Sequence, residues 1–257
     1  MLEVFIDRAC ALGREPRVRA LGPITLDAAD PSTVNRLAGG GILLVCARTS
    51  DGAPSLPSVR AIRRANPHVV IVLCAEWREA GRIPLARWTV AGVDEFVTFG
   101  EALDVAEVLR VVQVRLEAPP PAEELKLLRA GSPASRELDV VLYGLRNSCG
   151  SLHAANLAAR FGYSLRSIRE FLLAAGFPRP RDVCRIGRFL HMAELIERGV
   201  EAPHELARRL GFGDATEMRK VKSRLRRSVL RGSDGALGRF ARRFPRLLAT
   251  IGRPFAE

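Results

Sequence analysis

The chain has 257 residues, which is room for two domains of ordinary size, each able to bury its own core. Its formal net charge of +12 lies entirely in the second half, because residues 1–118 hold 14 basic and 14 acidic residues, whereas residues 119–257 hold 26 basic and 14 acidic residues. A general bias of the whole chain toward basic residues does not explain this asymmetry. It predicts a neutral domain joined to a domain that binds a polyanion.

The start of the chain and its apolar runs indicate a cytoplasmic protein without membrane contact. Residues 1–7 lack the charged start and the long apolar stretch of a signal peptide. No apolar run approaches the ~20 residues that a membrane-spanning helix needs. The five cysteines are odd in number and no two have a metal-ligand spacing such as Cys-x₂-Cys, which favours reduced thiols with no bound metal or cofactor.

The neutral half alternates apolar runs with helical patterns. The runs expected to form strands cover residues 4–6, 24–26, 42–46, 69–74 and 96–99. The helical patterns cover residues 31–37, 56–65, 83–91 and 101–118, and Pro16 interrupts a weaker one at residues 10–21. The runs at 42–46 and 69–74 do not alternate with polar residues, as in central strands covered on both faces. We therefore expect an α/β domain with a five-stranded, parallel, doubly wound sheet of the flavodoxin type.

The order and spacing of these elements resemble the receiver domain of bacterial response regulators. The resemblance places Cys46 at the phosphoacceptor position, Cys74 at the switch Ser/Thr position and Phe99 at the lysine position. Asp7 alone remains of the acidic pair after the first strand. Phosphoryl transfer to a carboxylate needs an Asp nucleophile, a Mg²⁺ ion held by carboxylates, and a cation. The resemblance therefore implies a pseudo-receiver that is not phosphorylated. Asp51 lies in the turn-like segment Ser-Asp-Gly and is expected to cap it. Cys46 is expected to pack as a core thiol, and a redox-sensing thiol at this position is the alternative.

Binding is the role that remains for the neutral half. Its last helix carries more apolar residues than one face against a sheet uses, and such a surplus marks a contact surface. In receivers the helix at this position takes part in dimer formation, so the resemblance implies a homodimer with Val108 and Val112 in its interface. The alternative is that residues 123–129 or the second domain cover the surplus. A separate alternative makes this half a sensor that binds a small molecule near Asp7 and Cys46.

Three consecutive prolines, Pro119 to Pro121, break the helical pattern and favour an extended spacer. A short helical pattern follows at residues 123–129, and the segment GSPAS at residues 131–135 breaks it again. The sequence predicts domains at residues 1–118 and 136–257 with a Pro-rich linker at 119–135.

The basic half is helical throughout and contains a repeat. The segment LAARFGYS at residues 157–164 recurs, degenerately, as LARRLGFG at residues 206–213, so that a helix, a glycine turn and a second helix occur twice. Ser164 and Asp214 are candidates to cap the second helix of each copy. The expected helices cover residues 137–146, 152–161, 165–175, 181–198, 202–210, 215–230 and 236–250. Residues Val183, Ile186, Leu190 and Ile196 of the long helix are expected to face inward.

The repeat resembles the DNA-binding domain of the AraC/XylS family of bacterial transcription regulators, in which a linker helix joins two helix-turn-helix units. The resemblance covers residues 137–230. The linker helix at residues 181–198 is about 27 Å long at 1.5 Å per residue, which suits two recognition helices about one DNA turn, roughly 34 Å, apart. The sequence departs from the family where Met218 and Lys222 stand at positions that are usually aromatic, and in the segments that close each unit.

The resemblance and the charge together predict contacts to promoter DNA. In the first recognition helix Leu165, Ile168 and Leu172 are expected to be buried, and in the second Met218, Val221 and Leu225. The residues expected to contact DNA are Arg166, Ser167, Arg169 and Glu170 in the first, and Thr216, Glu217, Arg219, Lys220, Lys222, Ser223, Arg224, Arg226 and Arg227 in the second. Lys222, Arg224, Arg226 and Arg227 are assigned to phosphates. Base reading is assigned mainly to the first recognition helix, where Arg166 and Arg169 can bond guanine edges.

The function expected is a DNA-binding transcription regulator that also contacts RNA polymerase. An enzyme is not expected, because no Gly-rich phosphate loop follows the first strand and no Gly-x-Ser-x-Gly elbow occurs. The four histidines, His68, His153, His191 and His204, are scattered without a nucleophile partner.

Overall fold

The protein forms two compact units, residues 1–117 and 118–257. The computed structural model describes residues 3–28, 30, 32–49, 52–76, 85–99, 105–149, 152–231 and 235–252.

The first unit contains a five-stranded parallel sheet, as the sequence predicts. Its strands are β1 (Val4–Asp7), β2 (Ile24–Leu26), β3 (Ile42–Val45), β4 (Val70–Glu76) and β5 (Glu95–Phe99), in the order β2-β1-β3-β4-β5. All neighbouring strands are parallel, with β3 paired to β4 from Ile42↔Val70 to Val45↔Leu73. This strand order is that of flavodoxin-like folds, in which the sheet is covered on both faces.

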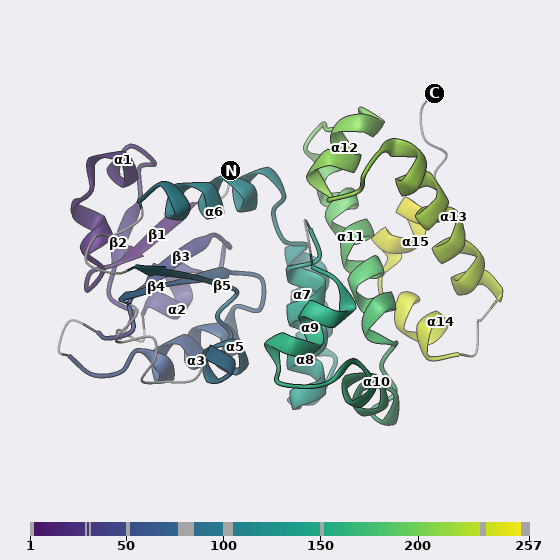
Figure 1. Cartoon of the computed structure of the whole chain (residues 1–257), viewed down its shortest axis with the longest axis horizontal. Helices are drawn as coiled ribbons and strands as arrows, with labels where there is room; N and C mark the ends of the chain where they lie inside the picture. The colour runs from purple at the N-terminus through teal and green to yellow at the C-terminus, as the bar shows by residue number, and fades with distance from the viewer. Residues whose placement is uncertain are drawn as a thin grey trace. The chain divides into compact units, whose positions relative to one another are not determined.

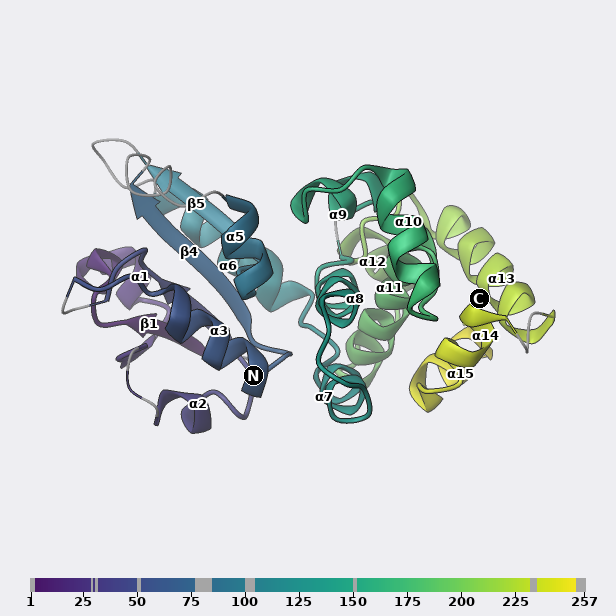
Figure 2. The ribbon, with the colours of Figure 1, turned by 90° about the horizontal axis from the view of Figure 1, so that it is seen from below.

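Helices cover both faces of this sheet. Helices α2 (Thr33–Arg36), α3 (Leu56–Ala65) and α5 (Leu85–Ala91) lie on one side, and α1 (Pro16–Arg19) and α6 (Val105–Glu117) lie on the other (Figure 1). Figure 2 looks from the α3 side and shows that helix in front of the strands. Successive strand residues point to opposite faces, so Leu43 packs with the α3 side and Leu44 with the α6 side. Pro16 begins α1 after the short 3₁₀ helix η1 (Ala11–Arg14), which explains the weak helical pattern there.

The assignment of Val108 and Val112 to a dimer interface is wrong. Both side chains are buried in the core between α6 and the sheet, with Val111 beside them. The apolar surplus of α6 is smaller than the sequence suggested, because Leu109 and Leu116 are also partly buried against the same core. Among the described large apolar side chains of α6, that of Val114 is exposed.

The second unit is all helical. Its helices are α7 (Ala122–Ala130), α8 (Arg136–Arg146), α9 (Ala154–Arg160), α10 (Leu165–Ala174), α11 (Pro180–Glu197), α12 (Pro203–Arg209), α13 (Ala215–Arg231), α14 (Ala236–Ala241) and α15 (Pro245–Gly252). The predicted linker at 119–135 belongs to this unit, since it contains α7, whose Leu125 and Leu128 are buried. The predicted final helix at 236–250 is two helices, with Pro245 opening the second.

The centre of this unit is the pair α8 and α11. Val183, Ile186 and Leu190 of α11 are fully buried as predicted, whereas Leu195 is buried in place of Ile196. The end of α8 approaches α11 closely because Gly187 of α11 has no side chain: a Cβ atom there would lie 2.9 Å from the Leu145 carbonyl oxygen and 1.8 Å from the Oγ atom of Ser148, just after α8. The Nε2 atom of His191 lies 3.1 Å from the carbonyl oxygens of Leu145 and Arg146, at the end of α8.

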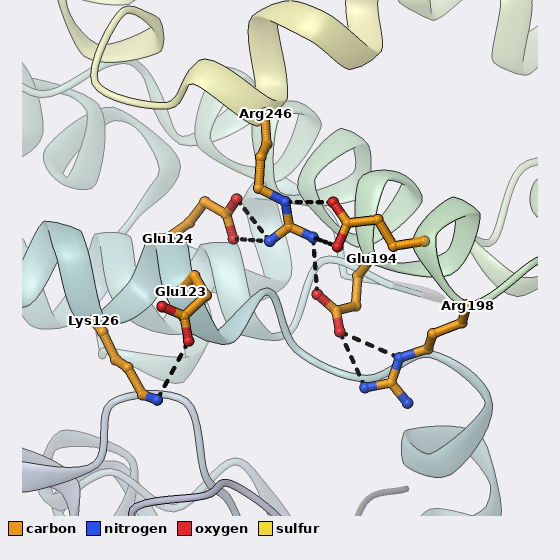
Figure 3. A network of polar contacts seen from close by, with 7 residues as sticks. Glu123, Glu124, Lys126, Glu194, Arg198 and Arg246 are labelled. Carbon is orange, nitrogen blue, oxygen red and sulfur yellow. Dashed lines mark hydrogen bonds and ion pairs between the residues drawn. The ribbon is translucent and has the colours of Figure 1, made fainter.

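An ion-pair network joins α7, α11 and α15 (Figure 3). The Nη1 atom of Arg246 lies 3.0 Å from both carboxylate oxygens of Glu124, and its Nη2 atom lies 2.6 Å from Glu197 Oε2 and 3.2 Å from Glu194 Oε2. Arg198 also pairs with Glu194, at 3.0 Å. Burial raises the pKa of the Glu124 carboxyl despite the positive charge of Arg246. The network fixes α15 against α11, although the three helices are far apart in sequence.

Candidate nucleic-acid interface

Two helical pairs, α9–α10 and α12–α13, repeat the same backbone turn. Gly162 and Gly211 both have positive φ, +73° and +70°, a region that favours glycine. The N–H of Tyr163 donates to the carbonyl oxygen of Ala158 at 2.9 Å, and the N–H of Phe212 donates to that of Ala207 at the same distance. Such a hydrogen bond is typical of a helix C-terminus that ends in a residue of left-handed conformation. The repeat in the sequence is therefore a repeat of backbone geometry.

Both predicted capping residues cap their helices. Ser164 Oγ accepts a hydrogen bond from the N–H of Ser167 at 3.0 Å. Asp214 Oδ1 accepts from the N–H of Glu217 at 2.6 Å, and Glu217 Oε2 accepts from the N–H of Gly213 at 2.7 Å. The second arrangement is a variant of the capping box, in which the carboxylate of Glu217 bonds the N–H of the residue before the cap. The second turn is also one residue longer, so that α13 starts one residue later in its copy than α10 does.

An aromatic residue of each turn is held between a ring and a guanidinium. The ring of Tyr163 stacks on Phe171 with centroids 5.1 Å apart, and the Arg136 guanidinium lies 5.0 Å from its centre. In the second pair, Phe212 lies 6.2 Å from Phe189, with the Arg188 guanidinium 5.1 Å from its centre. Arg136 and Arg188 have no special position in the sequence pattern, so this support of the turns was not predicted.

Helix α10 turns a polar face to solvent. Ile168 and Leu172 are fully buried, but Leu165 is 51% exposed, so its assignment to the buried stripe is wrong. Leu165 is the first residue of α10, so it lies at the end of the apolar stripe and is only partly covered. The four predicted contact residues are all exposed: Arg166, Ser167, Arg169 and Glu170. Two of them pair within the helix, because Arg166 Nε lies 3.0 Å from Glu170 Oε1. Ser167 and Ser164 hydroxyl groups lie 2.7 Å apart at the cap.

Helix α13 buries a lysine in its apolar stripe. The buried residues are Met218, Lys222, Leu225 and Val229, whose spacing of four, three and four residues follows one helical face. Val221 is only half-buried, and Lys222, which is 6% exposed, takes the place expected for it. The assignment of Lys222 to a phosphate contact is therefore corrected to a position in the stripe. Burial and the nearby Arg226 charge lower the pKa of the Lys222 ammonium to about 8.

The other predicted contact residues of α13 are exposed. They are Thr216, Glu217, Arg219, Lys220, Ser223, Arg224, Arg226 and Arg227. Glu217 is engaged in the capping box, and the Nε of Arg227 donates to the carbonyl oxygen of Ser223 at 3.4 Å. The exposed face of α13 therefore carries several positive charges and one carboxylate that is held at its N-terminus.

The residues that the receiver resemblance assigns to the phosphoacceptor pocket lie at the carboxyl edge of the first unit's sheet. Asp7 is buried, its Oδ1 accepts from the N–H of Ala28 at 3.2 Å, and burial raises the pKa of its carboxyl. Cys74 is buried and Cys46 is half-buried in one apolar cluster, which also contains Cys10. The predicted set did not include Cys10. The side chain of Phe99 and the whole of Asp51 lie outside the described residues.

No family model, no curated protein and no solved structure matches this chain. In the described part of the chain, no helix is long and apolar enough to cross a membrane. The same residues contain no group of three or more His, Cys, Asp or Glu side chains that could hold a metal ion.

Proposed function

We propose that the helical unit binds double-stranded DNA and that the protein regulates transcription in the manner of the AraC/XylS family that its sequence resembles. The observation that carries the proposal is the duplicated helical pair. In each pair the same glycine turn joins a first helix to a second helix that has exposed basic side chains. A helix-turn-helix unit places such a second helix in the major groove. The net charge of +12 of this half supplies the attraction to phosphates.

Helix α11 is the spacer between the two pairs. It contains 18 residues and joins the end of α10 to the start of α12 (Figure 1). Such a helix is about 27 Å long. With the turns at its ends, this length suits two recognition helices in successive major grooves on one face of the duplex, roughly 34 Å apart.

The two pairs are proposed to have different tasks. In α10, Arg166 and Arg169 are exposed, and a guanidinium can donate two hydrogen bonds to a guanine edge. In α13, Arg224, Arg226 and Arg227 are exposed beyond the first turns of the helix, which suits contacts to phosphates. We therefore assign base reading mainly to α10 and anchoring on the backbone mainly to α13.

The first unit is proposed to act without phosphoryl transfer. Cys46 follows β3 where a receiver has its Asp nucleophile, and a thiol does not form the acyl phosphate that such a switch uses. Its proposed role is contact with a partner, such as a second copy of the chain or RNA polymerase. The interface does not involve Val108 and Val112, since both are buried in the core.

Selection from a random duplex library tests the proposal. The full chain is expected to enrich one sequence motif and to protect two segments of the enriched duplex about one turn apart on one face. Its affinity should fall steeply as salt is added, because released counterions contribute to binding. Failure to enrich any motif, with no retardation of duplex DNA at low salt, would refute the proposal.

A further inference from the structure

Three of the five cysteines gather at the carboxyl edge of the sheet in the first unit. Strands β3 and β4 pair as far as Val45↔Leu73, so the next residues, Cys46 and Cys74, follow at adjacent positions of neighbouring strands. Neighbouring strands lie about 4.8 Å apart. Both side chains share the α6 side of the sheet with Leu44 and Val72, since residues two apart on a strand face the same way.

Cys10 completes the cluster from the loop after β1. Its N–H donates to the carbonyl oxygen of Asp7 at 2.8 Å, and its side chain packs in the same apolar cluster as Cys46 and Cys74. The neighbouring thiols of Cys46 and Cys74 lower the pKa of the Cys10 thiol. The neighbouring Cys10, together with burial, raises the pKa of the Cys74 thiol. Cys10 is therefore the member of the cluster whose thiolate form its neighbours favour.

The three thiols differ in their access to solvent. Cys10 is 5% exposed and Cys74 is 1% exposed, whereas Cys46 is half-buried. A small oxidant therefore reaches Cys46 first. Reactivity of a cysteine depends on thiolate character and on exposure, and here Cys46, the most accessible of the three thiols, shares a cluster with Cys10, whose pKa is lowered.

We propose that Cys46 and Cys10 form a peroxide-sensitive pair, in which a hydroperoxide oxidises Cys46 to a sulfenic acid and Cys10 then closes an intramolecular disulfide. Cys10 is the resolving residue because it lies in a loop, whereas Cys46 and Cys74 are fixed side by side by the strand pairing. The site is a modification site of the first unit and does not depend on DNA binding.

The chemistry proceeds in two steps. Cys46 loses its proton to water, and its sulphur attacks one oxygen of hydrogen peroxide. The S–O bond forms, the O–O bond breaks, and the departing hydroxide takes up a proton to give water. The Cys10 thiolate then attacks the Cys46 sulphur, so that the S–S bond forms, the S–O bond breaks and hydroxide leaves. The two sulphurs lose two electrons and the peroxide gains them.

The remaining cysteines provide internal controls. Cys184 is buried in the helical unit, and burial raises the pKa of its thiol to about 12, so it should resist the same oxidant. Cys184→Ser should leave the reaction of Cys46 and Cys10 unchanged.

Alkylation and peptide mapping of the full chain test the proposal. After treatment with stoichiometric hydrogen peroxide and alkylation in denaturant, the wild-type protein should carry alkyl groups on three cysteines instead of five, and the digest should contain the peptides of Cys10 and Cys46 joined by a disulfide. Cys46→Ser should abolish this cross-link. Cys10→Ser should also abolish it and should leave a sulfenic acid on Cys46 that dimedone traps.

Several outcomes would overturn the proposal. One is unchanged alkylation of Cys46 at peroxide concentrations that oxidise free cysteine. Another is a cross-link that joins different chains or that involves Cys149 or Cys184. A third is one zinc ion per purified chain that blocks alkylation of the cluster, which would make it a metal site. The wild-type peptide map decides these points even where a variant does not fold.

Discussion

The pairs α9–α10 and α12–α13 share a backbone and differ in what their side chains do. Gly162 and Gly211 make the same turn, yet the buried position occupied by Leu172 in α10 is occupied by Lys222 in α13. The first cap is a serine hydroxyl, and the second is a carboxylate in a variant of the capping box. The shared turn therefore sets where the second helix of each pair begins, whereas the stability and the charge of that helix differ between the two pairs.

The largest effect is expected from giving the first pair the buried lysine of the second. Leu172→Lys should reduce the free energy of unfolding by about 4 kcal/mol, because it removes a fully buried apolar side chain and buries an ammonium. Chemical denaturation followed by circular dichroism measures this change. Leu173→Lys is the matched control, because Leu173 is 39% exposed and should change stability little. Equal losses in both variants would show that α10 does not pack as described.

The next effect concerns the ion-pair network that joins α15 to α7 and α11. Arg246→Ala should cost about 3 kcal/mol, since Glu124 is left buried without its closest positive charge. Arg198→Ala is the control, because its pair with Glu194 is more exposed and should contribute less than about 1 kcal/mol. Helix α15 packs on α11 and α13, so hydrogen exchange should accelerate more in α13 than in α10. Equal acceleration in both helices would remove this distinction between the pairs.

Replacing the buried lysine should stabilise the second pair. The pKa of Lys222 in the folded protein, about 8, is below the ordinary value of 10.5, so the buried charge destabilises the fold at neutral pH. Lys222→Leu should raise the free energy of unfolding by about 2 kcal/mol at pH 7. This advantage should shrink as pH rises from 8 to 10.5, because Lys222 loses its proton in the folded protein first, and it should vanish above 10.5, where Lys222 is neutral in both states. Lys220→Leu, at an exposed position, is the control; a gain independent of pH would contradict the assignment.

The smallest effect separates the two caps. Ser164→Ala and Asp214→Ala should each cost about 1 kcal/mol, and Asp214→Ala should cost more because it also removes a negative charge from a helix N-terminus. Hydrogen exchange of the first turn of α10 and of α13 measures the two effects separately. A larger loss for Ser164→Ala would mean that the capping box adds nothing to the second pair.

The sequence predicted what depends on local periodicity and missed what depends on tertiary packing. Apolar runs without alternation located β3 and β4, and the glycine repeat located both turns, because strand burial and positive φ leave direct patterns. Val108 and Val112 were placed on a surface because the pattern of α6 does not show how wide a face the sheet covers. Lys222 was placed outside because Val221 is more apolar, although the helical stripe passes through position 222. The proximity of Cys10 to Cys46 and Cys74 depends on a loop, which has no period.

The division of labour between α10 and α13 is tested most directly by titrating a selected duplex and a scrambled duplex with the full chain, Arg169→Ala and Arg226→Ala over a range of salt. Arg169→Ala should weaken binding to the selected duplex by about 1–3 kcal/mol and leave the scrambled duplex nearly unaffected. Arg226→Ala should weaken both equally and reduce the salt slope by about one. Equal losses for both variants on both duplexes would contradict the division.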